Sequence, residues 1–244
     1  MHHLLLIDVG NTRLKWAEAE PRGAIKPRGH IATAQATARW AAAFARKHKN
    51  QRIVVASVVP AVTRVLRRVF PDALLVTGTL PGLPLAFDYP RPGAIGADRI
   101  AAAIGAMAHG PAIVISCGTA TAFSVLDRRG RFCGGAIMGG MMTQLTALLG
   151  ATAQLPAARV PANPRALGRS TRAAIQAGVA LGYRGAVREI ISGLRKELGA
   201  PARILVTGGE AVRLRHLAGV GRIEFRPLLV FEGLRIIAAA RPGP

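Results

Sequence analysis

LLLIDVGNTRLK, residues 4–15, is the stretch that decides the fold, and it predicts two β-strands joined by a tight turn. Residues 4–9 form a short and almost entirely apolar run. A Gly-Asn pair follows at residues 10–11, and alternation of apolar and polar side chains resumes over residues 13–19. We therefore predict a β-hairpin near the start of the chain.

The turn of this hairpin has the chemistry of a phosphate site. Gly10 lets main-chain amides approach an anion closely, while Asn11 and Thr12 add neutral hydrogen-bond donors. Lys15 adds a mobile positive charge. Asp8 stands at the end of its strand, where a carboxylate can hold the hydrated Mg²⁺ that accompanies a nucleotide. An ordinary Asn-containing turn capped by Asp8 is the alternative interpretation.

A second unit of the same kind lies about half a chain length later. Residues 112–115 predict a strand, Ser-Cys-Gly-Thr at 116–119 predicts a turn, and residues 120–126 predict a second strand. A late Thr-Gly-Gly turn at residues 207–209 follows another short strand at 203–206. The sequence therefore contains three glycine-bearing turns that each follow a strand.

Strands and helices alternate through both halves of the chain, which is typical of an α/β protein. Helices are predicted at residues 34–49, 61–69, 98–109, 141–149, 171–198 and 231–240, and further strands at 53–57 and 74–77. We predict a duplicated architecture with halves at residues 1–110 and 111–244 and a ligand cleft between them.

Composition excludes several classes of protein. Half of the 244 residues are hydrophobic and 18% are charged, which is a globular composition. Because no apolar run approaches the roughly 18 to 20 residues that span a bilayer, we expect neither a signal peptide nor a membrane anchor. Cys117 and Cys133 provide neither a disulfide framework nor metal-ligand spacing, so a reducing cytoplasm is the expected setting.

The formal net charge of +21 is unusual and would attract nucleic acid or phosphorylated molecules. The arginines are scattered in pairs, such as Arg67-Arg68 and Arg128-Arg129, and aromatic residues make up only 5% of the chain. A generally arginine-rich composition therefore explains the charge better than a nucleic-acid interface.

The three turns also carry a resemblance. Residues 8–15, 118–121 and 207–209 are similar, in that order, to the phosphate-1, phosphate-2 and adenosine elements of the acetate kinase, sugar kinase and Hsp70 superfamily. Within that superfamily, Gly-Ala-Asp-Arg at residues 96–99 resembles the substrate motif of the type III pantothenate kinases, a family also called Bvg accessory factor-like. Tyr89 and Pro92 keep that family's Tyr-x-x-Pro-x-x-x-Gly spacing before it.

This resemblance implies a duplicated ribonuclease H-like (actin-like ATPase) fold and phosphorylation of pantothenate by ATP with Mg²⁺. It implies a base at Asp98, which a helix N-terminus would keep ionised. The implied ATP-binding residues are Asp8, Val9, Gly10, Asn11, Thr12, Arg13, Leu14, Lys15, Gly118 and Thr119. The implied pantothenate-binding residues are Tyr89, Gly96, Ala97, Asp98, Arg99 and Thr171.

Each substrate residue also has a purely structural interpretation. Asp98 is placed to cap a helix, and Arg99 to pair with a neighbouring acid. Thr171 is placed to start a helix, and Tyr89 to pack beneath its loop.

The sequence departs from the family's pattern at one cation ligand. Ser116 stands where the family usually has an aspartate that binds the activating K⁺ or NH₄⁺. A neutral hydroxyl is a much weaker ligand for a monovalent cation. Ser124 and Gly139 also replace residues common in the family, aspartate and proline.

Two further hypotheses stay open at this point. A weakly active or regulatory protein of the same fold, associated with transcription and nucleic acid, fits the charge and the missing carboxylate. Another small-molecule kinase of the superfamily would need a different substrate loop. Retention of Asp8, Lys15, Asp98, Arg99 and Thr171 favours the pantothenate kinase. The resemblance also implies a homodimer.

Overall fold

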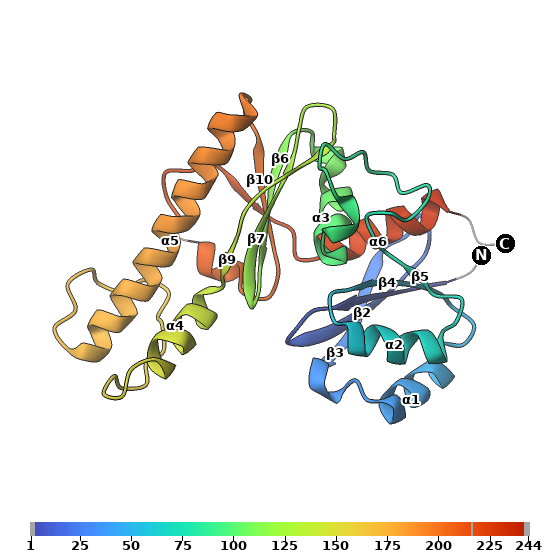
Figure 1. Ribbon diagram of the computed structural model, residues 1–244, viewed down its shortest axis with the longest axis horizontal. Helices are drawn as coiled ribbons and strands as arrows, with labels where there is room; N and C mark the ends of the chain where they lie inside the picture. Colours follow the sequence, from blue (N-terminus) through green and yellow to red (C-terminus); the bar gives the residue numbers. More distant parts are fainter. Residues whose placement is uncertain (1–2, 216, 242–244) are drawn as a thin grey trace. The chain divides into compact units, whose positions relative to one another are not determined.

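A computed structural model describes residues 3–215 and 217–241 of the chain. These residues form two compact units (Figure 1). The first unit contains residues 1–110, 126–134 and 228–244, and the second contains residues 111–125 and 135–227. The predicted division after residue 110 coincides with the first boundary. The chain then returns to the first unit twice, where the sequence indicated one continuous second half.

The sheet of the first unit has five strands in the order β3-β2-β1-β4-β5. Its strands are β1 (Leu4–Val9), β2 (Arg13–Ala19), β3 (Ile25–Ala32), β4 (Arg52–Ser57) and β5 (Leu74–Leu75). Strand β1 lies at the centre, antiparallel to β2 and parallel to β4. Its apolar run follows from this position, because a central strand is buried on both faces.

Helices cover both faces of this sheet (Figure 1). Helices α1 (Ala38–His48) and α2 (Pro60–Val69) pack on one face, with Phe44, Leu66 and Phe70 in the core beneath them. Leu5, Ile7 and Val9 of β1 point into the same core. Because side chains alternate along a strand, Asp8 points to the opposite face.

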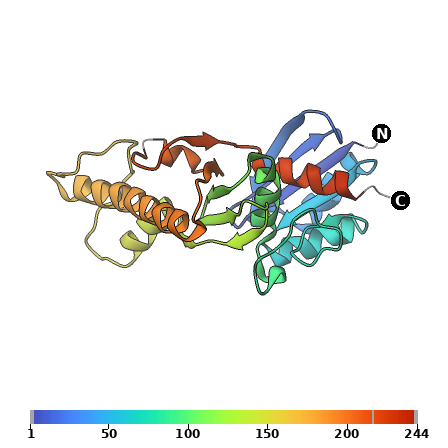
Figure 2. The same ribbon diagram turned by 90° about the horizontal axis from the view of Figure 1, so that it is seen from above.

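Helices α3 (Ala97–Ala106) and α6 (Leu229–Ala240) lie on that opposite face and cross each other closely (Figure 2). A Cβ atom on Gly233 would overlap the carbonyl oxygen of Ala101, and one on Gly105 would overlap that of Leu229. The two helices therefore approach to backbone contact at both glycines. Helix α6 completes the first unit although it comes last in the chain.

The second sheet repeats the strand order of the first. It runs β11-β10-β6-β7-β8, and β9 pairs with β7. Its strands are β6 (Ala112–Cys117), β7 (Ala120–Leu126), β8 (Phe132–Gly134), β9 (Ile137–Gly139), β10 (Arg203–Thr207) and β11 (Ile223–Phe225). In both sheets, three consecutive strands and then two more arriving by crossovers build the same 3-2-1-4-5 order. The predicted duplication is therefore visible in the topology.

Helices α4 (Met141–Gly150) and α5 (Thr171–Leu198) belong to the second unit. Ser170 caps α5 by accepting a hydrogen bond from the amide of Ala173, and Gly199 ends it with φ of 60°. Inside the unit, the buried Tyr183 hydroxyl lies 2.8 Å from the Thr121 hydroxyl and so links α5 to β7. Short 3₁₀ turns complete the chain at Thr33–Gln35, Pro92–Ala94, Met107–His109 and Ala211–Leu214.

Most predicted elements are present, with shifted ends. The helix predicted at 98–109 ends at Ala106 and continues as a 3₁₀ turn, and the strand predicted at 74–77 keeps only two residues. Residues 131–137, which the sequence predicts as one strand after a turn at 127–130, contain β8 and the start of β9 instead, and strands β3 and β11 were not predicted. Within the described residues, no helix is long and apolar enough to cross a lipid bilayer.

Candidate active site

Hydrogen bonds fix the main chain of the first hairpin turn, while the side chains of the turn are exposed. The amide of Gly10 donates to the carbonyl of Arg13 at 3.0 Å, which closes the turn. Thr33 fixes it from the side, because its hydroxyl donates to the Gly10 carbonyl at 2.7 Å and its amide donates to the Thr12 carbonyl at 3.0 Å. The side chains of Asn11, Thr12 and Arg13 are exposed. The turn therefore presents polar groups on a backbone that is already fixed.

Two of the residues predicted to bind ATP, Val9 and Leu14, have completely buried side chains. They pair across the hairpin at the last register position of β1 and β2. Their side chains anchor the turn in the core, so only their main chain is available to a ligand.

Asp8 lies at the carboxyl end of β1 with its carboxylate 3.9 Å from the ammonium group of Lys15. Burial raises the pKa of Asp8 to about 6, although the charge of Lys15 lowers it. The carboxylate of Asp98 raises it further, so the two acids are close enough to repel each other. A cation between them would relieve this repulsion.

Asp98 lies in the first turn of α3 and does not cap that helix. Gly96 is the N-cap, and the Asp98 carboxylate accepts a hydrogen bond from the amide of Arg99 at 2.9 Å. Burial raises the pKa of Asp98 above its ordinary value, even though this hydrogen bond and the charge of Arg99 lower it. The sequence prediction that the helix N-terminus keeps Asp98 ionised overlooked this burial, which outweighs the favourable groups.

Arg99 and Tyr89 meet on one aromatic ring. The guanidinium of Arg99 lies 5.4 Å from the ring centroid of Phe132, and Tyr89 contacts the same ring edge-on at 5.9 Å and 86°. Burial lowers the pKa of Arg99, while Asp98 and Tyr89 raise it. Tyr89 is 37% exposed, so it does not pack beneath its loop. Phe132 was not predicted, because it is an isolated aromatic residue 33 positions beyond Arg99 in the sequence.

The second hairpin turn is fixed by the start of α4. The amide of Gly118 donates to the Ala120 carbonyl at 3.0 Å, so here too the glycine amide bonds to the first residue of the next strand. The amide of Gly140 and the hydroxyl of Thr143 both donate to the Thr119 carbonyl, at 2.9 and 2.6 Å. A side chain at position 140 would overlap the Gly118 carbonyl. Gly140 is thus a required part of this turn that the sequence did not reveal.

The late glycine turn reaches the same end of the second sheet. Gly208 has φ of 96°, and a Cβ atom there would overlap the carbonyl oxygen of Cys117. The amide of Glu210 donates to that same carbonyl at 3.1 Å. Ser116 is directly beside Thr207 in the parallel register of β6 and β10. The turns at residues 116–119 and 207–209 therefore lie together at the carboxyl ends of β6 and β10.

Thr171 is the first residue of α5 and is exposed. The helix-capping role belongs to Ser170 instead, so the side chain of Thr171 is not needed to start the helix.

The predicted site residues thus gather in two sets. Asp8, the first turn, Tyr89, Asp98 and Arg99 lie in the first unit, and Ser116, the second turn and Thr171 lie in the second. Among the described residues, no group of three or more His, Cys, Asp and Glu side chains could hold a metal by itself. Mg²⁺ commonly keeps several waters and takes one or two carboxylates plus phosphate oxygens, which Asp8 fits.

Comparison with known proteins gives consistent results. A profile of the family described as type III pantothenate kinase matches residues 4–193. A type III pantothenate kinase from Akkermansia muciniphila is 35% identical over 237 residues, which cover 96% of this chain and 97% of the relative. Another, from Moorella thermoacetica, is 37% identical over 196 residues, which cover 77% of this chain and 76% of the relative.

Two solved structures are similar in fold. A Campylobacter jejuni protein assigned to the Baf family of transcriptional activators has a TM-score of 0.66 at 19% identity, with 96% of each chain covered. An inorganic polyphosphate/ATP-glucomannokinase from Arthrobacter has a TM-score of 0.56 at 14% identity, with 99% of this chain and 100% of the other covered. At these identities the likeness concerns the fold, and it confirms the duplicated ribonuclease H-like architecture.

Proposed function

Because the chain belongs to the type III pantothenate kinase family, we propose that it transfers the γ-phosphoryl group of ATP to the terminal hydroxyl of pantothenate. The product is 4'-phosphopantothenate, on the way to coenzyme A. One observation on this chain's own residues supports the proposal. The carboxylate of Asp98, in the substrate motif, interacts electrostatically with that of Asp8, beside the first turn, within the first unit.

The nucleotide is proposed to bind along the glycine turns. Main-chain amides of the first turn, with Asn11, Thr12 and Lys15, would contact phosphate oxygens. Mg²⁺, held through water by Asp8, would offset phosphate charge. The full set proposed to bind ATP is Asp8, Val9, Gly10, Asn11, Thr12, Arg13, Leu14, Lys15, Gly118 and Thr119.

Asp98 is proposed to orient the pantothenate hydroxyl and to accept its proton. As the hydroxyl oxygen bonds to the γ-phosphorus, the bond to the β–γ bridging oxygen breaks and ADP leaves. The hydroxyl proton passes to the Asp98 carboxylate late in this step. Burial favours the acceptor, because it raises the pKa of Asp98 and so its affinity for a proton.

Pantothenate carries a carboxylate, and Arg99 is the proposed partner for it. The stacking of Arg99 on Phe132 supports this role because it holds the guanidinium in one place. Gly96 leaves room for the Asp98 carboxylate, since a Cβ atom there would lie 2.7 Å from it. The full set proposed to bind pantothenate is Tyr89, Gly96, Ala97, Asp98, Arg99 and Thr171.

The monovalent cation is the point at which we propose a difference from the family pattern. Ser116 is half-buried beside Thr207 and offers only hydroxyl and main-chain oxygens. We therefore propose that activation by K⁺ or NH₄⁺ is weak in this protein.

One assay tests the proposed reaction: ATP consumption with and without pantothenate, repeated in K⁺, NH₄⁺ and Na⁺. We expect turnover that requires pantothenate and changes less than about threefold among the three cations, because a neutral ligand binds each of them weakly. ATP turnover without pantothenate would instead indicate another small-molecule kinase. A complete lack of turnover would contradict the proposal.

A regulatory protein associated with nucleic acid is the alternative, and its support in the sequence is the +21 charge and the missing carboxylate at Ser116. Absence of turnover together with salt-sensitive DNA binding would favour it. We further propose a homodimer located in the cytoplasm, as the family resemblance and the two free cysteines suggest.

The raised pKa of Asp8 predicts that this residue makes the ligand-free protein less stable above pH 6. The ordinary pKa is 3.8 and the folded value about 6, so the folded state prefers protonated Asp8. The loss of folding stability caused by ionised Asp8 is therefore absent below about pH 4. It grows between pH 4 and pH 6 and reaches its full size above about pH 6. We expect Asp8→Asn to raise the free energy of unfolding at pH 7.5 by about 3 kcal/mol, while abolishing activity.

Urea unfolding of both proteins at pH 7.5 and pH 4 measures this effect, and the difference should vanish at pH 4. Asp127→Asn is a control of opposite sign. Burial raises the pKa of Asp127, but hydrogen bonds from Arg131 and Arg129 and the charge of Arg131 together lower it. Asp127→Asn should therefore destabilise the protein at pH 7.5. An Asp8→Asn protein that is less stable than wild type at pH 7.5 would contradict the prediction.

A further inference from the structure

A cavity of about 1170 Å³ lies in the first unit, at the amino ends of β1 and β4. Leu4 begins β1 in this cavity, whereas Asp8 lies four residues further along the strand, roughly 13 Å away at about 3.3 Å per residue. Ligands of open α/β sheets usually bind outside the carboxyl ends of the strands. This cavity is therefore separate from the candidate active site and independent of the proposed reaction.

The floor of the cavity is apolar. The ends of helices α1, α2 and α6 and the two strand starts provide Leu4, Ala45, Ile53, Val69, Phe70 and Ala238. Leu4, Ile53 and Phe70 belong to the buried core of this unit. Ligand pockets typically have volumes of roughly 300 to 1,000 Å³, and this one has room for a complete small molecule.

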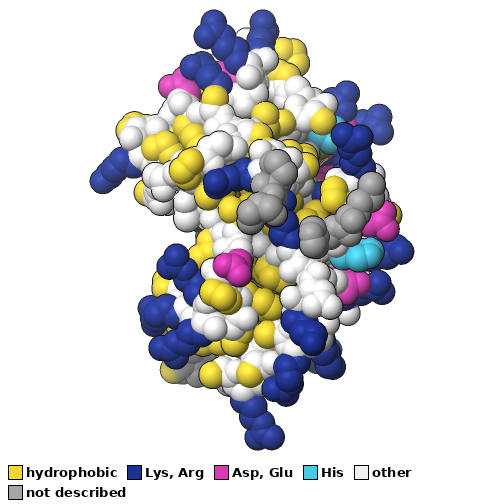
Figure 3. Space-filling model, turned by 90° about the vertical axis from the view of Figure 1, so that its right-hand side faces the viewer, with side chains coloured by type: hydrophobic (Ala, Val, Ile, Leu, Met, Phe, Trp, Pro, Cys, Tyr) yellow, Lys and Arg dark blue, Asp and Glu magenta, His cyan; other side chains and the backbone are white. Residues whose placement is uncertain are grey.

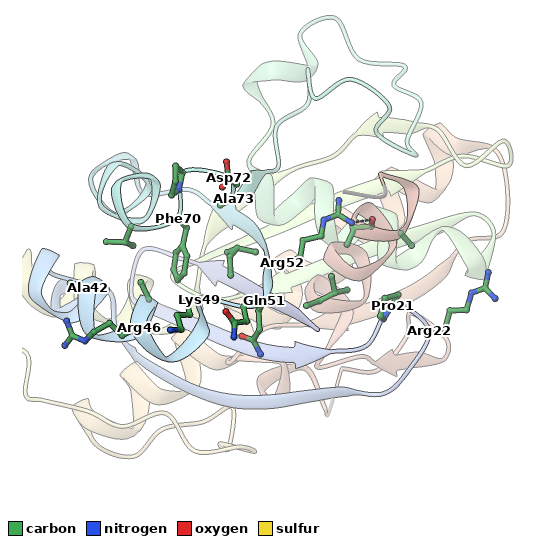
Figure 4. A pocket seen from close by; sticks show the side chains of 18 residues that line it. Pro21, Arg22, Ala42, Arg46, Lys49, Gln51, Arg52, Phe70, Asp72 and Ala73 are labelled. Atoms are coloured by element: carbon green, nitrogen blue, oxygen red, sulfur yellow. Dashed lines mark hydrogen bonds between the residues drawn. The ribbon is translucent and has the colours of Figure 1, made fainter. Parts of the chain in front are cut away.

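The rim of the cavity is cationic. Arg22, Arg46, Lys49 and Arg52 line it, against one carboxylate, Asp72. Figure 4 shows the four cations spread along the pocket, from Arg46 and Lys49 at one end, past Arg52, to Arg22 at the other. In Figure 3, which shows the molecule from the right-hand side of Figure 1, Lys and Arg side chains are abundant and acidic ones few.

Among the side chains that the structure describes, these positive charges have no acidic partners, because none of the four cations forms a salt bridge with a carboxylate. Arg52 is half-buried and instead donates to the main-chain carbonyls of Ala238, at 2.9 Å, and Arg241. Burial lowers the pKa of Arg52, and the charge of Arg241 lowers it further. An anion in the cavity would offset this charge.

We propose that this cavity binds a small anionic amphiphile, a molecule with a phosphate or carboxylate group on an apolar body. The uncompensated cations select the anionic group, and the apolar floor selects the body. A nucleic-acid surface would need the cations but not the floor, and aromatic residues for base stacking are absent from the lining apart from Phe70.

The test uses three matched probes on the full-length protein without ATP or pantothenate: octyl phosphate, octan-1-ol and inorganic phosphate. Isothermal titration calorimetry measures each affinity. Octyl phosphate should bind at least ten times more tightly than either of its two parts, because only it uses both floor and rim. Equal affinities for octyl phosphate and octan-1-ol, or for octyl phosphate and inorganic phosphate, would overturn the proposal.

Two variants locate the binding. Ala42→Trp, at an exposed lining position of α1, should fill the cavity and weaken octyl phosphate binding at least tenfold. Arg46→Gln with Lys49→Gln should weaken it about tenfold, which corresponds to about 1.4 kcal/mol. Arg64→Gln with Arg67→Gln is the matched control, because it removes two exposed charges of α2 that lie outside the lining.

Unchanged binding in Ala42→Trp, or an equal loss in the control pair, would show binding elsewhere and overturn the proposal. Displacement of octyl phosphate by a single-stranded oligonucleotide, with steep salt dependence, would assign the surface to nucleic acid and also overturn it. Pantothenate-dependent ATP turnover of Ala42→Trp is measured in parallel. We expect the turnover of Ala42→Trp to equal that of wild type. A change in turnover would concern the proposed reaction and would not test binding in this cavity.

Discussion

Asp98→Asn is expected to lower kcat for pantothenate phosphorylation by two to four orders of magnitude while leaving the fold intact, the range typical of losing a positioned acid–base group. Asparagine has nearly the same shape and can still accept the hydrogen bond from the Arg99 amide. It cannot take up the hydroxyl proton. Because the residues proposed to bind ATP do not include Asp98, the KM for ATP should change little.

Steady-state kinetics with both substrates varied measures this effect, and circular dichroism with thermal melting checks the fold. Asp72→Asn is a suitable control, because it removes an exposed carboxylate at the amino ends of the strands. Removing the buried Asp98 charge should also raise stability slightly, since burial disfavours it. A kcat within tenfold of wild type would remove Asp98 from the role of base.

Gly233→Ala is expected to be among the most destabilising single changes in the first unit. The added methyl group would overlap the carbonyl oxygen of Ala101 in α3, which is main chain and cannot turn aside. Helices α3 and α6 would have to move apart along their whole contact. We expect a loss of about 3 kcal/mol or more in the free energy of unfolding and a melting temperature lower by roughly 10 °C.

Gly178→Ala tests the same substitution where space is available. Gly178 is exposed in the middle of α5, and a Cβ atom there would meet nothing within 4 Å. Since alanine favours a helix over glycine, this variant should gain about 0.5 to 1 kcal/mol. Urea unfolding of the two variants beside wild type measures both values. Equal effects in the two variants would show that the helix crossing does not set the stability.

The sequence predicted what depends on local chemistry. Gly10 and Gly118 close the expected turns, and the residues 96–99 begin the expected helix. It did not predict β3, because Pro27 and Gly29 interrupt the strand pattern there. This edge strand tolerates them through a register irregularity opposite Trp16 and Ala17.

Features that depend on tertiary packing were not predicted from the sequence. The interaction between Asp8 and Asp98 arises because Asp8 points to the sheet face on which α3 lies, and α3 carries Asp98, 90 residues further along the chain. Phe132 joins Arg99 and Tyr89 only because residues 126–134 return to the first unit. The raised pKa of Asp98 depends on burial, which a motif does not encode.

The place of α6 in the chain also sets the order in which a growing polypeptide can fold. The first unit lacks this helix, and with it the covering of β1 and β4 on one face, until residues 229–240 have left the ribosome. The second unit is complete after residue 227. During translation the N-terminal strands must therefore wait longest for their last packing partner. A nascent chain paused before α6 would leave the surface of α3 around Gly105, which packs against Leu229 of α6, exposed to chaperones.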